Sequence, residues 1–76
     1  MNNERRKVIN NMIAKLEEVQ SELESCADWE QEAYDNLPEG IQESERGDRM
    51  QENVDNLYEV TESITDLIDQ LNDIIS

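Results

Sequence analysis

The side chains that most often carry out chemistry in proteins are scarce in this sequence. Cys26 is the only cysteine among the 76 residues, and there is no histidine. Zinc and copper sites need several imidazole or thiolate ligands, and Ser–His or Cys–His catalysis needs an imidazole base. The sequence therefore predicts a protein that is not an enzyme and has no metal ion, cofactor or catalytic residue. Cys26 itself falls among apolar positions, so we expect a buried structural thiol.

Carboxylates are abundant, and one of them stands out by its position. Apolar residues recur at steps of three and four from Ile9 to Cys26, and the same spacing resumes at Ala33. Glu30 occupies the position between, where the pattern calls for an apolar side chain. A catalytic acid or metal ligand normally has a second acidic or imidazole group beside it, and Glu30 has none in the pattern. We therefore expect a structural role for Glu30 in preference to a chemical one.

The elements that position these residues are two long helices. Pro38, Gly40 and Gly47 cluster in one place, and the stretches on either side contain neither residue type. This pattern predicts helix 1 over about 3–36, a connection over about 37–44 and helix 2 over about 45–75. Asn3 and Ser44 are the expected N-caps. Pro38 is expected to begin a single helical turn within the connection. Equal helices and a short link favour one domain, an antiparallel, coiled-coil-like hairpin of the all-α class.

Heptad letters a to g, counted with Ile9 at position a in helix 1 and Met50 at position a in helix 2, describe how the two helices are expected to meet. Residues that share a letter form a row along the helix. Rows a and d hold most of the apolar residues, so a layers of one helix should face d layers of the other. Matching them places Ile9 opposite Ile74 and Val19 opposite Ile64. In this register Glu30 faces Asn53, which is the single polar break in the interior of helix 2. We expect this polar layer to set the register, as isolated polar residues do in coiled coils.

A second apolar row flanks the predicted seam. We expect the hairpin to leave this e row uncovered, so that a second copy covers it and forms a homodimeric four-helix bundle. A foreign partner is the other possible occupant. Trp29 and Tyr58 are candidate aromatic anchors for a partner. The predicted dimer or partner row consists of Ile13, Ala27, Tyr34, Val54, Thr61, Ile68 and Ile75.

The charge balance limits the possible partners. Twenty acidic residues against six basic ones give a net charge of −14, which repels nucleic acids and anionic membranes and attracts basic protein surfaces. The candidate acidic binding surface lies on helix 2 and comprises Glu59, Glu62, Asp66 and Asp69. No membrane-spanning run and no signal-peptide pattern is present, so we expect a cytoplasmic protein.

The segment AYDNLPEGIQESERG, residues 33–47, resembles a segment of small acidic helical proteins from phages, prophages and gut Firmicutes. That resemblance implies a mobile-element origin and location in the host cytoplasm, and it implies no activity. Two functions remain open. One is an inhibitor that mimics nucleic-acid charge and binds a basic host defence protein, as an anti-CRISPR DNA mimic does. The other is a structural or regulatory homo-oligomer.

Overall fold

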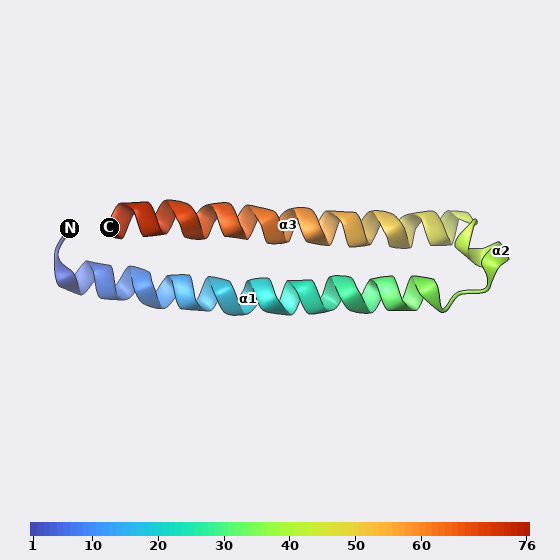
Figure 1. Ribbon diagram of the computed structural model, residues 1–76, viewed down its shortest axis with the longest axis horizontal. Coiled ribbons are helices and arrows are strands. Elements are labelled where there is room, and N and C mark those ends of the chain that lie inside the picture. The colour runs from blue at the N-terminus through green and yellow to red at the C-terminus, as the bar shows by residue number, and fades with distance from the viewer.

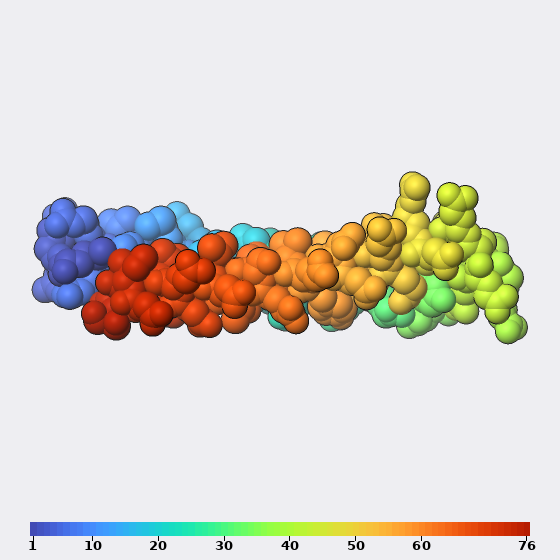
Figure 2. Space-filling view, turned by 90° about the horizontal axis from the view of Figure 1, so that it is seen from above, coloured from blue at the N-terminus to red at the C-terminus, as the bar shows by residue number.

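The computed structural model describes residues 1–76 as an all-α hairpin of two long antiparallel helices (Figure 1). Helix α1 spans Asn3–Asp35, the short helix α2 spans Glu39–Gln42, and α3 spans Glu45–Ile75. The Cα atoms extend over 59 × 15 × 12 Å. Figure 2 shows the resulting narrow rod, with both chain termini at the end opposite α2. The predicted hairpin is confirmed, with helix ends within one residue of those expected.

The helix caps differ in detail from the expected ones. The N-cap of α1 is Asn2 rather than Asn3, and its Oδ1 accepts a hydrogen bond of 2.9 Å from the backbone N–H of Arg5. Ser44 is the N-cap of α3, but its hydroxyl donates to the carbonyl of Ile41 instead of accepting from α3. Ser44 therefore joins α3 to α2 and does not satisfy a free N–H of its own helix.

The connection folds back tightly onto the end of α1. Pro38 is the N-cap of α2, one position before the helical start expected for it. The Gln42 side-chain amide donates to the carbonyl oxygens of Tyr34 at 3.0 Å and Asp35 at 3.3 Å. These carbonyls belong to the last turn of α1, beyond the reach of the helix's own N–H groups, and the Tyr34 carbonyl also accepts from the backbone N–H of Leu37 at 3.0 Å. Gln42 thus acts as a cap supplied by the connection.

The interface between the helices is centred on rows a and e, and not on rows a and d as predicted. Four members of the e row are among the most buried residues in the chain: Ile13, Ala27, Val54 and Thr61, which are 0–7% exposed. Three further members are half-buried, namely Tyr34, Ile68 and Ile75. The prediction that the hairpin leaves this row uncovered was therefore wrong.

Small residues explain the displacement of the seam. Ala27 is fully buried, and Gly47, also in the e row, is buried against the connection. Residues of this size allow two backbones to approach closely on the side where they lie. Row d offers no such residue in α3, where it begins with Arg46 and Asn53. The helices therefore roll towards row e, and row d turns towards solvent.

This rotation exposes most of row d. Five of its large apolar side chains are 43–54% exposed, namely Met12, Val19, Val60, Leu67 and Ile74. Cys26 is also exposed, which contradicts the expected buried thiol. Only six residues of the chain are buried, and no large side chain is completely buried. Because so little apolar surface is removed from water, a single hairpin has a minimal core.

Candidate interaction surfaces

Glu30 and Asn53 meet across the hairpin, as the sequence predicted. The Asn53 side-chain amide donates to Glu30 Oε2 at 3.1 Å. The environment differs from the expected buried layer, because Asn53 is exposed and Glu30 is only half-buried. The pair belongs to a shallow hollow that it shares with Asn56, Leu57 and Val60. Glu30 therefore carries a hydrogen bond on the solvent-facing edge of the seam and has no second carboxylate for chemistry.

Polar side chains close the opposite edge of the seam, beside row e. The Gln20 amide donates to the carbonyl of Thr61 at 3.1 Å and to the hydroxyl of Thr65. Gln51 donates to the side-chain oxygen of Gln31 at 3.4 Å. Gln20 was not among the residues predicted from the sequence, although its place in row e between Ile13 and Ala27 was a usable signal. These hydrogen bonds join α1 to α3 along this edge, so row e needs no second chain to cover it.

Tyr58, one of the two candidate anchors, is engaged within the hairpin. Its hydroxyl donates to Asp28 Oδ1 at 2.7 Å, and its side chain is 41% exposed. The hydrogen bond to Asp28 raises the pKa of the Tyr58 phenol above its ordinary value, with smaller contributions from desolvation and from the charges of Asp28 and Glu24. A partner would meet the ring of Tyr58, since its hydroxyl already has an acceptor.

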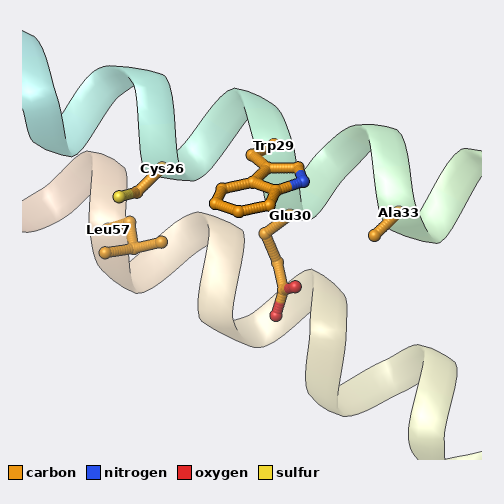
Figure 3. Close-up of a pocket in the computed structure, with 5 residues that line it drawn as sticks. All are labelled: Cys26, Trp29, Glu30, Ala33 and Leu57. Carbon is orange, nitrogen blue, oxygen red and sulfur yellow. The ribbon is translucent and has the colours of Figure 1, made fainter.

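Trp29, the second candidate anchor, is 74% exposed, the highest value among the large apolar residues. It borders an open hollow whose other walls are Cys26, Glu30, Ala33 and Leu57. Figure 3 shows the indole lying along the rim of this hollow, while the Glu30 side chain points towards α3. Because most of the Trp29 side chain is left uncovered by the hairpin, it is suited to anchor a contact with another chain.

An open face runs along the hairpin on the side of Trp29. We define it as rows d and g of both helices, next to the seam and away from row e. Another open hollow on this side is lined by Met12, Lys15, Leu16, Val19 and Leu71. The exposed large apolar residues of the open face are Val8, Met12, Val19, Trp29, Val60, Leu67 and Ile74. Single exposed apolar residues are common on protein surfaces, but these residues form a stripe along one face. Such a stripe indicates self-association or another protein contact.

The acids are distributed in the opposite way. Of the twenty acidic residues, only Glu22 lies in rows d and g. The predicted binding acids are all exposed, on the outer surface of α3: Glu59, Glu62, Asp66 and Asp69. None of their carboxylates takes part in a hydrogen bond within the chain. The hairpin thus has a nearly acid-free apolar face and an acidic outer surface.

Arg6 holds the open end of the hairpin. Its Nε donates to the carbonyl of Ile75 and its Nη1 donates to Asn3 Oδ1, both at 3.2 Å. A guanidinium at the last turn of α3 is favourable because the carbonyl end of a helix carries partial negative charge. Basic residues at the start of α1 oppose the dipole of their own helix. Arg6 therefore has a compensating partner across the hairpin.

No group of three or more Asp, Glu, Cys or His side chains is arranged to hold a metal ion. None of the helices combines the length and the apolar character needed to cross a membrane. Comparisons with protein-family models, with curated proteins and with solved structures found no match for the chain.

Proposed function

We propose that this protein acts by protein–protein binding, as a homodimer whose acidic surface occupies the nucleic-acid site of a basic partner. The observation that supports this proposal is the separation of the two surfaces. The apolar open face is suited to self-association, and the acids are left outside it. In such a dimer the acidic surfaces of both copies remain exposed.

The charge density of the rod is of the right order for nucleic-acid mimicry. Duplex DNA carries about one negative charge per 1.7 Å of its axis. Two overlapping copies, each with twenty acids over a length of 59 Å, would carry roughly one carboxylate per 1.5 Å before the basic residues are subtracted. A single hairpin would reach only about half that density. Dimerisation therefore strengthens the electrostatic similarity.

The partner class follows from this chemistry and from the resemblance of residues 33–47 to phage and prophage proteins. A basic channel that normally holds DNA or guide RNA would attract the rod by long-range electrostatics. A defence nuclease in the cytoplasm of a phage-infected host is the candidate partner with such a channel. The proposed protein would then be a non-enzymatic inhibitor of that nuclease, in the manner of an anti-CRISPR protein.

The alternative is a structural or regulatory homo-oligomer in which the acids serve only solubility. The open face favours this alternative as much as it favours the inhibitor, because both need self-association. Binding to a basic partner is what separates the two functions.

The test is capture of host proteins on the immobilised protein at low salt, followed by competition with duplex DNA. We expect the captured proteins to be nucleic-acid-binding, to be released by DNA and to elute at moderate salt. The triple variant E59K/E62K/D66K should lose this binding and keep its helical content. The matched control E59D/E62D/D66E retains every charge and should bind like the parent chain.

Two outcomes contradict the inhibitor. One is a partner that stays bound in molar salt and is not displaced by DNA, which would place the contact on an apolar surface. The other is the absence of any salt-sensitive, DNA-displaced partner when the protein is a dimer, which leaves the structural homo-oligomer.

A further inference from the structure

We infer that the open face is covered by a second copy of this chain, lying antiparallel with its connection at the opposite end of the rod. In this arrangement α1 packs on α1 of the second copy, and α3 packs on α3. The two-fold axis crosses α1 beside Val19. This inference deepens the self-association part of the proposed function and does not depend on the acidic surface having a partner.

Charge selects a second copy as the occupant. Two chains of net charge −14 repel each other over most of their surfaces. The open face is where this repulsion is smallest, because Glu22 is the only acid in its rows and Glu30 is the acid at its edge. The same face carries Lys15 and Arg49, which a neighbouring acidic chain would attract. A highly acidic protein can therefore associate with itself through this face and not through the others.

The need for further burial points the same way. Val19 is the middle residue of α1, which spans Asn3–Asp35, and it is 44% exposed. An axis beside Val19 makes the two copies of α1 overlap along their whole length. Complete overlap removes the largest possible apolar area from water. A single hairpin buries little of its apolar surface, so this area is still exposed before the two copies associate.

The pairing between the two copies of α1 gives the orientation. About the axis at Val19, residues that lie equally far on either side of it face each other. Lys15 lies four residues before Val19 and Glu22 three residues after it, so Lys15 lies nearly opposite Glu22 of the second copy. The pair occurs twice because of the symmetry. The only cation of row g in α1 thus meets the only acid of that row.

The apolar residues of row g follow the same symmetry. Val8 and Trp29 are the two exposed apolar residues of that row, 54% and 74% exposed. They lie at nearly equal distances on either side of Val19, so Val8 of one copy faces Trp29 of the other. This contact gives Trp29 the anchoring role that its exposure suggests.

The exposed apolar residues of α3 are also placed nearly symmetrically about this two-fold axis. Gln20 bonds to Thr61 and Thr65, so the level of Val19 on α3 lies close to Ile64. Val60 and Leu67 stand nearly symmetrically about that level and are 47% and 49% exposed. Val60 of one copy therefore faces Leu67 of the other, and both exposed side chains become covered.

The opposite orientation, with both connections at the same end, lacks this complementarity. There α1 would pack on α3 of the second copy. The Glu30–Asn53 hydrogen bond fixes which residues of α1 and α3 lie at the same level. The row g residues of α3 nearest to the level of Lys15 are Ser63 and Gln70, and those nearest to Glu22 are Asn56 and Ser63. The charged residues would have no opposite charge to meet, so the antiparallel arrangement is favoured.

Cross-linking through Cys26 tests the arrangement. About the axis at Val19, Cys26 faces Met12 of the second copy, and its own counterpart lies about 21 Å away along the rod. The variant M12C, which retains Cys26, should become a covalent dimer under mild oxidation, because disulfides need Cα atoms within about 7 Å. Wild type and M12C/C26A, each with one of these cysteines, should stay uncross-linked.

A second variant places one cysteine at the axis. V19C/C26A should cross-link by itself, because position 19 faces its own counterpart. Circular dichroism checks that each variant keeps its helices, and analytical ultracentrifugation gives the mass of the wild type. A wild-type monomer would overturn self-association and the homodimer of the proposed function together. A dimer in which single cysteines at 12, 19 and 26 cross-link alike would overturn only the antiparallel arrangement and its axis.

Discussion

The backbone of Gly47 lies directly against the carbonyl group of Gln42. A Cβ added at Gly47 would lie 2.6 Å from the carbonyl carbon of Gln42 and 2.8 Å from the carbonyl oxygen of Ile41, with the Gln42 oxygen closer still. The φ angle of Gly47 is not positive, so glycine is required here by close contact and not by backbone conformation. This contact brings α2 against the first turn of α3 and sets the closed end of the hairpin.

Replacing Gly47 with Ala should therefore destabilise the protein, although Ala is the better helix former. Backbone atoms of Ile41 and Gln42 must move to admit a methyl group, and we expect a loss of about 2–4 kcal/mol in the free energy of unfolding. Gly40 provides the matched control, since nothing lies within 4 Å of a Cβ built there. G40A should be neutral or stabilising by up to about 1 kcal/mol. Urea unfolding of both variants checks this, and equal stabilisation by both would refute the contact.

Replacing Glu30 and Asn53 together with Leu should raise the thermal stability of the protein. The pair lies at the edge of the open face, which the proposed dimer covers. Buried ionic groups exchanged for apolar residues of similar volume often leave stability unchanged or raise it by about 1–4 kcal/mol. N53L alone should be less favourable than the double variant, because Glu30 then loses its donor. Thermal unfolding at several protein concentrations would show the gain and any change in association. A double variant clearly less stable than wild type would mean that the Glu30–Asn53 hydrogen bond is a net stabilising contact.

The hydrogen bond between Tyr58 and Asp28 predicts a pH dependence at alkaline pH. The folded-state pKa of Tyr58 is raised above 10.0, so the neutral phenol is favoured in the folded chain. Its contribution to stability should be complete below pH 10.0 and should be lost as the pH rises through the folded-state pKa. The variant Y58F should lack this contribution and its loss at alkaline pH.

Ultraviolet titration of the phenol in a Y34F background measures Tyr58 alone. D28A should return the Tyr58 pKa towards its ordinary value, because the acceptor and its charge are both removed. The matched control D55A removes an exposed acid of α3 that makes no bond to Tyr58, and it should leave the titration nearly unchanged. A Tyr58 pKa that is the same with and without Asp28 would contradict the contact.

The sequence by itself determined the two helices, their ends and their antiparallel pairing. Pro38 and the nearby glycines interrupt an otherwise continuous helical pattern, and these signals are local. The opposition of Glu30 and Asn53 was also predictable, because matching the apolar rows leaves the two polar residues at the same level.

Only the tertiary structure decided which side of each helix is covered. Rows d and e are both apolar and lie on either side of row a, so hydrophobic spacing alone does not choose between them. The choice depends on how closely the backbones approach at small residues such as Ala27, and on the contact of Gly47 with the connection. That approach buries Val54 and Thr61 in the hairpin and turns Val19 and Leu67 outward. The surface open to a second copy is thus the reverse of the one the pattern suggested, because it is set by packing between residues distant in sequence.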